Sequence, residues 1–322
     1  MESLLEIRNL KVEYHTYEGV ISALDIEYLK LQKREILSLV GESGCGKSTL
    51  ALSILKILPP NGIIKNGNII FDGLDLVKMN EEQMKKIRGK RISIVFQDPR
   101  ASFNPVFTIG EQITRVLITH KNLSKKESLQ EVENLFKMVG LPDPKRIINS
   151  YPHELSTGMC QRALIAMALS CKPDLLIADE PTSALDVSIQ AQIIELLRDL
   201  KNKIETSILY ITHDLAVAAQ LTERIAVMYA GNIVEIGNVE DIYDNPLHPY
   251  TYGLLKSIPK ANTAKLETIS GEVPDLFNPP SGCRFHPRCP YAIEVCKKQK
   301  PMLMNITENH SVSCFLYSEK NE

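Results

Sequence analysis

Residues 35–49 read EILSLVGESGCGKST, an apolar run followed directly by a glycine-rich turn and then by a segment with helical periodicity. The turn at 41–49 fits the spacing G-x-x-x-x-G-K-[ST], in which glycines let successive backbone N–H groups point inward at phosphate oxygens. Lys47 supplies a positive charge for the β- and γ-phosphates, Ser48 a hydroxyl for Mg²⁺, and Thr49 is placed for the α-phosphate. The loop residues expected to contact a nucleotide are Gly41, Ser43, Gly44, Cys45, Gly46, Lys47, Ser48 and Thr49.

Similar apolar runs recur along the chain and alternate with segments of helical periodicity. The runs are near-continuous, as is typical of strands buried on both faces of a sheet. This alternation of strands and helices predicts an α/β fold with a mostly parallel sheet. The expected strands are 35–40, 91–96, 174–179, 207–212 and 224–229, and the expected helices are 47–58, 187–202 and 215–222.

Three regions depart from this alternation. Residues 4–14 and 66–73 are typical of antiparallel edge elements, whereas residues 108–150 are helical and predict an insertion. The composition changes again near residue 240, where a proline- and cysteine-rich segment follows. The expected domains are a nucleotide-binding domain over 1–240, with a helical subdomain at about 100–170, and a C-terminal extension over 241–322.

Composition and charge exclude several classes of protein. The chain has 37 Lys and Arg against 39 Asp and Glu, a formal net charge of −2, which gives no bulk electrostatic reason to bind nucleic acid. No apolar run approaches the ~20 residues of a membrane span. The start, MESLLEIRNLKVEY, lacks the basic-then-apolar pattern of a signal peptide. We therefore expect a cytoplasmic protein whose membrane role comes through a partner.

Two further stretches carry chemistry. In LLIADEP, residues 175–181, four apolar residues run straight into two acids. Asp179 at the end of the strand can hold Mg²⁺, and Glu180 is then the candidate to orient and deprotonate a water in line with the γ-phosphate. In LSTGMCQRALIAMAL, residues 155–169, Ser156 opens a helical apolar run, and the amides of such a helix N-terminus form an anion site.

Together these residues resemble the ATP-binding-cassette ATPases over about residues 4–240. The resemblance implies a RecA-like parallel-sheet ATPase core with an antiparallel β subdomain and a helical insertion. It implies that Gln97, in VFQDP, contacts Mg²⁺ and the attacking water, and that His213, in ITHD, contacts the γ-phosphate. It also implies an aromatic residue that stacks on the base, for which Tyr14 fits better and Tyr17 is the fallback. Either tyrosine could instead be an ordinary strand aromatic.

In this family ATP lies between two subunits, and the resemblance answers which anion the helix at 155–169 awaits. Ser156 and the amide of Gly158 are expected to meet the γ-phosphate held by the opposite subunit, and Asp186, in PTSALD, matches the D-loop. The usual signature is Leu-Ser-Gly-Gly-Gln, from which Thr157 and Met159 depart. Thr157 adds a Cβ where the family prefers none, so we expect the approach to the nucleotide to be tighter or strained.

Two stretches resemble the peptide-importer branch of the family: QDPRASFNPVFTIGEQI at 97–113 and NPLHPYTYGLLKSIP at 245–259. This resemblance implies an ATPase that drives uptake of dipeptides or oligopeptides at the cytoplasmic face of the membrane. It implies two membrane-spanning permease subunits as partners, gripped by the helical insertion, a second ATPase subunit, and indirectly an extracytoplasmic substrate-binding protein. Importers of nickel or oligosaccharides belong to the same branch, and a soluble ATPase of DNA repair or translation is a further alternative.

The tail contains four of the seven cysteines, with the spacing C-x5-C-x6-C-x17-C: Cys283, Cys289, Cys296 and Cys314. Structural zinc sites usually carry a C-x2-C knuckle, which is absent from this spacing. Four thiolates from an irregular loop can hold a [4Fe–4S] cluster, which some dipeptide-importer ATPases carry at this place. We therefore expect a small irregular metal-binding extension that the cluster folds, with Zn²⁺, free thiols or disulfides as alternatives. His286 and His310 are expected at the surface.

Overall fold

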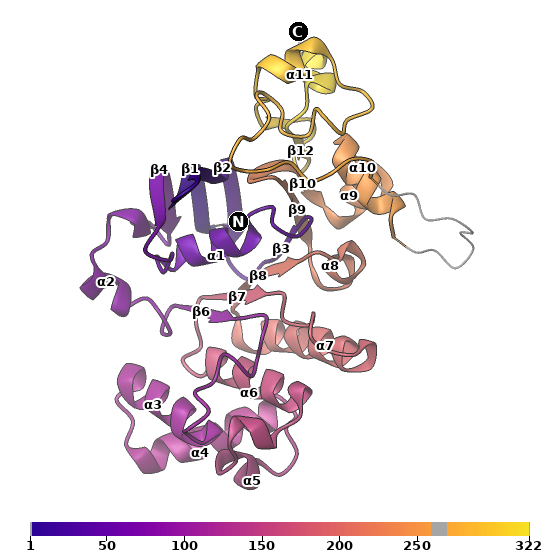
Figure 1. Ribbon diagram of the computed structural model, residues 1–322. Helices are drawn as coiled ribbons and strands as arrows, with labels where there is room; N and C mark the ends of the chain where they lie inside the picture. Colours follow the sequence, from indigo (N-terminus) through magenta and orange to yellow (C-terminus); the bar gives the residue numbers. More distant parts are fainter. Residues whose placement is uncertain (1, 259–268, 322) are drawn as a thin grey trace. The chain divides into compact units, whose positions relative to one another are not determined.

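The structure is a computed structural model that describes residues 2–258 and 269–321 (Figure 1). Its residues form two compact units, each described by itself: the first unit is Met1–Met79 with Thr212–Glu322, and the second unit is Asn80–Ile211. The part of the predicted C-terminal extension at 259–268 lies outside the described residues. Across the described ranges, no helix combines the length and the hydropathy that a membrane crossing requires.

The N-terminal part of the first unit is an antiparallel sheet with the strand order β2-β1-β4-β5. Its strands are β1 (Ser3–Thr16), β2 (Gly19–Gln32), β4 (Gly62–Phe71) and β5 (Leu74–Asp75). Ile7, Leu10 and Val12 of β1 are all fully buried, although the first is an odd and the other two are even positions. A register shift between Arg8 and Lys11 in the pairing with β4 explains this, because one extra residue moves the next side chains to the opposite face.

The remaining strands of the first unit follow the order β3-β9-β10-β12-β11. β3 (Ile36–Val40) runs parallel to β9 (Arg224–Tyr229), and β10 (Asn232–Asn238) returns antiparallel to β9. β12 (Ser311–Val312) pairs with β10, and β11 (Met304–Asn305) pairs with β12, so the tail adds strands to this sheet. The helices of the unit are α1 (Lys47–Ile54), α8 (Leu215–Leu221), α9 (Val239–Asp244), α10 (Pro249–Lys256) and α11 (Glu294–Lys298), with 3-10 turns η1 (Leu76–Lys78) and η3 (Phe315–Asn321).

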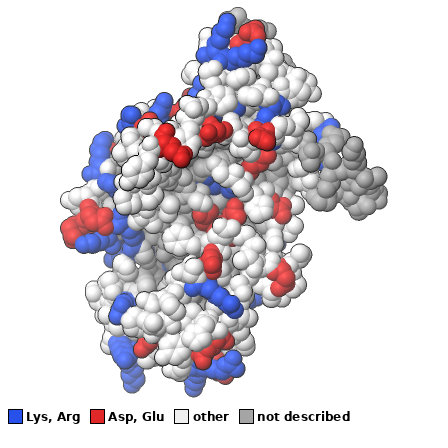
Figure 2. Space-filling model, in the orientation of Figure 1, with Lys and Arg blue, Asp and Glu red and all other residues white. Residues whose placement is uncertain are grey.

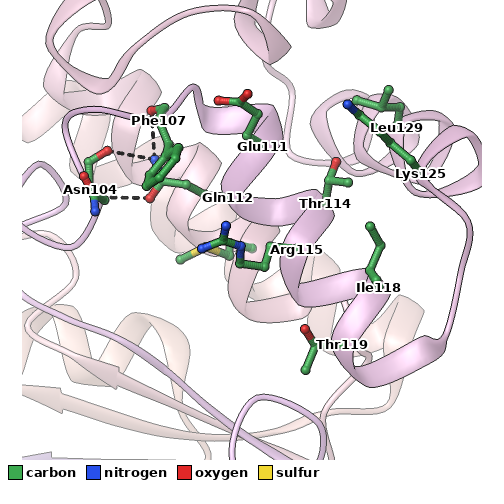
Figure 3. Close-up of a pocket in the computed structure, with 11 residues that line it drawn as sticks. Asn104, Phe107, Glu111, Gln112, Thr114, Arg115, Ile118, Thr119, Lys125 and Leu129 are labelled. Atoms are coloured by element: carbon green, nitrogen blue, oxygen red, sulfur yellow. Dashed lines mark hydrogen bonds between the residues drawn. The ribbon is translucent and has the colours of Figure 1, made fainter.

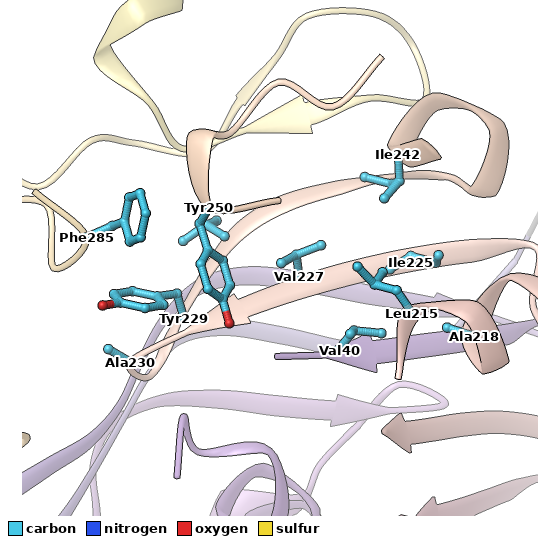
Figure 4. Close-up of a cluster of buried hydrophobic side chains, with 11 residues drawn as sticks. Val40, Leu215, Ala218, Ile225, Val227, Tyr229, Ala230, Ile242, Tyr250 and Phe285 are labelled. Carbon is cyan, nitrogen blue, oxygen red and sulfur yellow. The ribbon is translucent and has the colours of Figure 1, made fainter. Parts of the chain in front are cut away.

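A cluster of buried side chains joins this sheet to the C-terminal residues (Figure 4). The ring of Tyr229, at the end of β9, lies 4.6 Å from the ring of Tyr250 on α10 and 5.0 Å from that of Phe285 in the tail, measured between centroids. Aromatic rings at such distances stabilise a core beyond their burial alone. The cluster consists of Val40, Leu215, Ala218, Ile225, Val227, Tyr229, Ala230, Val234, Ile242, Tyr250 and Phe285.

The second unit combines a parallel sheet with a helical region. β6 (Ile92–Val95), β7 (Leu175–Asp179) and β8 (Ser207–Thr212) are parallel in the order β8-β7-β6, and every residue of β7 is buried. α3 and α4 begin with capping boxes, in which Thr108 pairs with Glu111 and Ser124 with Glu127. The helices are α2 (Glu81–Lys85), α3 (Ile109–Lys121), α4 (Lys125–Met138), α5 (Pro144–Ile148), α6 (Thr157–Leu169) and α7 (Val187–Ile204), with the 3-10 turn η2 (Pro152–Glu154).

The elements agree with the α/β prediction, with a few departures. The five expected strands are present as β3, β6, β7, β8 and β9, and the expected helices as α1, α7 and α8. α1 ends at Ile54, four residues before the expected position, and β2 and β10 were absent from the prediction. The domain boundary near residue 240 stays a prediction.

Charges of both signs are mixed on the surface. On the face drawn in Figure 2, basic side chains in blue are interspersed with acidic side chains in red, without a broad patch of one sign among the described residues of that face. This mixture is in line with the formal net charge of −2.

Candidate functional site

The predicted phosphate loop connects β3 to α1. Gly46 is the N-cap residue of α1 with a φ of 107°, a left-handed conformation, and a Cβ there would lie 2.8 Å from the carbonyl oxygen of Ala23. Within the described residues, no side chain caps α1, and its first turn contains no acid. The first backbone N–H groups of α1 are therefore not capped by a described side chain, and they can donate hydrogen bonds to a bound anion.

The ammonium of Lys47 lies inside this loop. Lys47 is 5% exposed, and its Nζ donates hydrogen bonds to the carbonyl oxygens of Gly41 at 2.8 Å and Glu42 at 3.0 Å. Gly41 is packed so closely that a Cβ there would overlap the carbonyl oxygen of Met228. The loop residues that lie exposed, where a ligand can reach them, are Ser43, Gly44 and Ser48.

Three other residues are predicted to contact the nucleotide, namely Tyr14 or Tyr17 at the base and Cys45 in the loop. The hydroxyl of Tyr14 on β1 donates a hydrogen bond to Oγ1 of Thr49 at 3.2 Å, whereas Tyr17 is fully exposed in the turn after β1. This places Tyr14 beside the loop, and the choice between Tyr14 and Tyr17 for the base stays a prediction. Cys45 is buried, which raises the pKa of its thiol, and its carbonyl oxygen accepts the N–H of Gly231 at 2.7 Å.

The acid pair lies in the second unit. Asp179 is the last residue of β7 and is 7% exposed, and Glu180 follows with a φ of 46°. A non-glycine residue in this left-handed region costs of order ~1–3 kcal/mol and persists where its surroundings hold it. The Glu180 N–H donates to the carbonyl oxygen of Ile211 at 2.9 Å, and Nε2 of Gln97 donates to Oε2 of Glu180 at 3.2 Å. The structure thus brings Gln97 and Glu180 together.

Ile189 lies next to both the start of α6, which carries the predicted signature, and Asp186 of the predicted D-loop. Ser156 is the N-cap residue of α6, and its Oγ accepts the N–H of Met159 at 3.3 Å. A Cβ on Gly158 would lie 3.1 Å from Cγ2 of Ile189. The N–H of Ile189 in turn donates to Oδ1 of Asp186 at 3.0 Å. The start of α6 and the start of α7 are therefore packed against each other.

The predicted residues fall into two groups, one on each unit. The first unit contains Tyr14, residues 41–49 and His213, which follows β8 and is exposed. The second unit contains Gln97, Ser156, Gly158, Asp179, Glu180 and Asp186. The roles of these residues in ATP chemistry stay predictions.

Sequence reasoning missed an ion pair at the loop. Nη1 of Arg288 in the tail donates to Oε2 of Glu42 at 2.8 Å, and Nη2 donates to Oε1 at 3.2 Å. The N–H of Glu42 donates to the hydroxyl of Tyr250 at 2.9 Å. An acid inside a phosphate loop is itself a signal that a cation lies nearby, but this cation is 246 residues further along the chain.

A pocket of about 570 Å³ opens in the helical region of the second unit, beside α3 and α4 (Figure 3). Gln112 on α3 fixes one wall, because its Nε2 donates to the carbonyl oxygens of Asn104 at 3.0 Å and Phe107 at 3.1 Å. The guanidinium of Arg115 lies 5.4 Å from the centroid of the Phe107 ring. The lining includes the apolar residues Phe107, Ile118, Leu129 and Met167 and charged residues of both signs, Glu111, Arg115 and Lys125.

The predicted metal centre of the tail is wrong. Across residues 2–258 and 269–321, which include Cys283, Cys289, Cys296 and Cys314, no group of three or more His, Cys, Asp or Glu side chains is placed to hold a metal ion. All four are free thiols. Burial raises the pKa of Cys283 to about 12 and that of Cys314 to about 11. The iron–sulfur cluster, the Zn²⁺ alternative and the metal-binding extension are therefore corrected.

Other contacts hold the tail. His310 is 4% exposed rather than at the surface, and its Nε2 lies 2.7 Å from Oε1 of Glu235, a fully buried residue of β10. His286 is half-buried, with Nδ1 3.0 Å from the carbonyl oxygen of Cys283. The side chain of Phe285 lies in the cluster of Figure 4. Buried hydrogen bonds and apolar packing thus anchor the tail.

Comparisons with known proteins bear on this geometry. Residues 24–183 match the family model described as ABC transporter, and residues 234–296 match the model described as the C-terminal region of oligopeptide/dipeptide transporters. The dipeptide transport ATP-binding protein DppD of Bacillus subtilis (strain 168) is 46% identical over 325 residues, which cover 100% of this chain and 97% of that protein. The chain belongs to the ABC transporter family.

Further relatives of this ABC chain are similar over nearly its whole length. The oligopeptide transport ATP-binding protein OppD of the same organism is 47% identical over 97% of this chain and 88% of its own, and AppD is 49% identical over 99% and 98%. A solved dimeric structure of the ATP-binding cassette MJ0796, bound to ADP and Pi, matches with a TM-score of 0.66 and 29% identity, over 73% of this chain and 98% of that chain. The predicted ABC nucleotide-binding fold and the ATPase class of the enzyme are confirmed.

Proposed function

We propose that this chain is the ATP-hydrolysing subunit of an importer for dipeptides or oligopeptides. Its similarity over nearly the full length to three proteins named for dipeptide or oligopeptide transport is the observation that carries this proposal. The match of residues 234–296 to the C-terminal region of such transporters supports the same substrate class, since it lies outside the part that matches ABC transporters in general.

The phosphate loop and the strand-end acid supply the groups that bind the nucleotide. Lys47 binds the β- and γ-phosphates, Ser48 and Asp179 hold Mg²⁺, and Tyr14 stacks on the base. The exposed hydroxyl of Ser48 and the carboxylate at the end of β7 are hard oxygen ligands, which fit Mg²⁺. When bound, the metal ion neutralises negative charge on the phosphates.

Glu180 is the general base of the reaction. Its carboxylate takes a proton from the water that attacks the γ-phosphate, and Gln97, 3.2 Å from that carboxylate, orients the water and contacts the metal. His213 contacts the γ-phosphate. The left-handed backbone of Glu180 supports this role, because strained residues tend to occur at functional sites.

A second ATPase subunit, identical or related, completes the reaction. Ser156 and the amide of Gly158 at the start of α6 contact the γ-phosphate bound to that subunit, and Asp186 belongs to the same interface. A helix N-terminus of this kind stabilises an anion that arrives from a partner. The solved dimers of the related cassette MJ0796 support this arrangement.

The importer places the chain at the cytoplasmic face of the membrane, beneath two permease subunits and, indirectly, an extracytoplasmic substrate-binding protein. The pocket of Figure 3 is the site where a cytoplasmic loop of a permease docks. Its apolar residues, with Glu111, Arg115 and Lys125 beside them, fit an amphipathic segment that carries polar groups next to its apolar face. Movement of the helical region during the ATP cycle then reaches the permease.

Peptide uptake tests the proposal. A strain that lacks this chain should take up a labelled dipeptide only when the parent chain is supplied. Glu180→Gln should lower uptake and ATP hydrolysis together by ~100-fold or more, because it removes the general base. Uptake of a free amino acid is the control and should not change. Loss of nickel or oligosaccharide uptake, with dipeptide uptake intact, would contradict the substrate class.

A further inference from the structure

The phosphate loop carries an acid in the segment that binds a polyphosphate. Glu42 is the second residue of the loop, and its side chain is 26% exposed. Like charges repel, and more strongly where protein shields them from water. An unpaired carboxylate at this position would therefore oppose the binding of ATP.

A single guanidinium from the tail neutralises this carboxylate. The side chain of Arg288 is 5% exposed and grips both oxygens of Glu42, the two-pronged geometry in which such pairs are strongest. Its other donors reach the carbonyl oxygens of Ser270 at 3.1 Å and Ile269 at 3.4 Å, and the hydroxyl of Tyr229 at 3.4 Å. All five N–H groups of the guanidinium are thus used, and its orientation is fixed.

Two further hydrogen bonds hold the backbone of Glu42. The N–H of Glu42 donates to the hydroxyl of Tyr250, a buried residue of α10 whose ring lies 4.6 Å from Tyr229 and 5.5 Å from Phe285. The carbonyl oxygen of Glu42 accepts the ammonium of Lys47 at 3.0 Å. Side chain, N–H and carbonyl of one loop residue are therefore all engaged, two of them by the C-terminal residues.

We propose that Arg288 and Tyr250 are positioning residues for ATP binding, through which the C-terminal extension sets the charge and the shape of the phosphate loop. Arg288 cancels the negative charge of Glu42. Tyr250 fixes the backbone of Glu42, whose carbonyl oxygen accepts a hydrogen bond from Lys47. The inference rests on the proposed function in one respect, namely that residues 41–49 bind ATP. It assigns to the tail a role in the affinity for nucleotide.

Replacing the two partners of the ion pair one at a time should affect ATP affinity differently. Arg288→Gln leaves a carboxylate in the loop and should weaken ATP binding by ~10-fold. Glu42→Gln leaves a cation near the phosphates and should not weaken ATP binding. The double variant Glu42→Gln/Arg288→Gln removes both charges and should bind ATP within ~3-fold of the parent. A merely structural pair would instead give losses in both single variants.

Isothermal titration calorimetry of the full chain with ATP in EDTA measures these affinities without hydrolysis. Arg224 and Glu35 form the matched control, a pair at 2.9 Å with side chains 22% and 7% exposed in the same unit. Arg224→Gln should lower the melting temperature and leave ATP affinity at the parental value. Arg288→Lys keeps the charge but not the two-pronged hydrogen bond, so it should bind ATP more tightly than Arg288→Gln, and a loss as large as that of Arg288→Gln would show that the charge is not the cause.

Three outcomes separate the possibilities. Equal weakening by Arg288→Gln and Glu42→Gln, without recovery in the double variant, would overturn the inference. Parental affinity in Arg288→Gln, with ATP binding abolished by Lys47→Ala, would overturn it and leave the proposed function intact. Parental affinity in Lys47→Ala would overturn the proposed ATP site itself.

Discussion

At the scale of single residues, a buried carboxylate organises the start of the C-terminal extension. Glu235 on β10 is fully buried, and it accepts the N–H groups of Leu247 at 2.8 Å and His248 at 2.9 Å. The ring of His310 lies 2.7 Å from the same carboxylate. A carboxyl group buried in this way is tolerated because its oxygens are hydrogen-bonded. The contacts bring His248 into a fully enclosed environment.

Burial of His248 makes stability depend on pH. Its Nδ1 accepts the N–H of Tyr250 at 3.0 Å, and burial lowers the pKa of His248 to about 4 from 6.5. Between pH 6.5 and about 4 the unfolded chain takes up a proton that the folded chain does not. The free energy of unfolding should therefore fall as the pH falls through this window, by roughly 3 kcal/mol from this residue. Urea unfolding at a series of pH values measures it.

His248→Asn separates this effect from the titration of carboxylates. The amide oxygen of Asn can accept the same N–H at the start of α10, because Asn is a good N-cap residue, but it does not titrate. The variant should lose less stability than the parent between pH 6.5 and 4. Parallel pH profiles for the two proteins would show that another group is responsible.

Whether a residue could be assigned from sequence depends on how far away its partners lie in the chain. Lys47 was predictable because its hydrogen-bond partner Gly41 lies six residues earlier, within the same motif. Arg288 was not, because nothing local to it reveals that it meets Glu42. The cysteine spacing likewise could not show that Cys283 is half-buried with a raised pKa, since burial is a property of the folded tail.

At the scale of elements, the start of α6 has two proposed roles, which are capping the helix and binding the γ-phosphate. The similarly capped start of α4 allows the two roles to be separated. Ser156 and Ser124 are both N-cap residues whose hydroxyls accept an N–H three residues later, at 3.3 Å in each case. Replacing either by Ala should lower the free energy of unfolding by about 1 kcal/mol. Only Ser156→Ala should also lower ATP hydrolysis by the assembled importer, by ~10-fold, because only Ser156 is proposed to contact the γ-phosphate.

Steady-state hydrolysis and urea unfolding of both variants make the comparison. If Ser124→Ala slowed hydrolysis as much as Ser156→Ala, the loss would come from helix stability alone. If neither variant slowed it, the contribution of Ser156 to catalysis would be rejected.

The strand β7 was predictable from its unbroken apolar pattern, whereas β2 and β10, which carry charged residues within the strand, were not. All five residues of β7 are buried, so its sequence LLIAD identifies it as a strand. β10 contains Glu235, which is completely buried, and its burial depends on partners from α10 and the tail. β2 interleaves charged residues with Leu24, Ile26 and Leu29, which obscures its alternation. The formation of β2 and β10 therefore depends on tertiary contacts that the local sequence does not reveal.

At the scale of the whole molecule, the question is whether the C-terminal extension folds separately, as the sequence-based boundary near residue 240 predicts. Within the first unit, β12 of the tail pairs with β10. Phe285 of the tail packs against Tyr229 of β9 and Tyr250 of α10. Contacts of this kind belong to a single core, and they predict cooperative unfolding across the boundary.

Hydrogen exchange of a tail variant tests this cooperativity. Phe285→Ala removes a buried ring and should cost about 3–5 kcal/mol, whereas Tyr291→Ala, at a tail residue that is 57% exposed, should cost less than about 0.5 kcal/mol. If the first unit has one core, Phe285→Ala lowers the protection of amides in β3 and β9 by as much as that of amides in β12. If the extension is a separate domain, the loss stays within residues 269–321, and the boundary near 240 is a boundary of folding as well as of sequence.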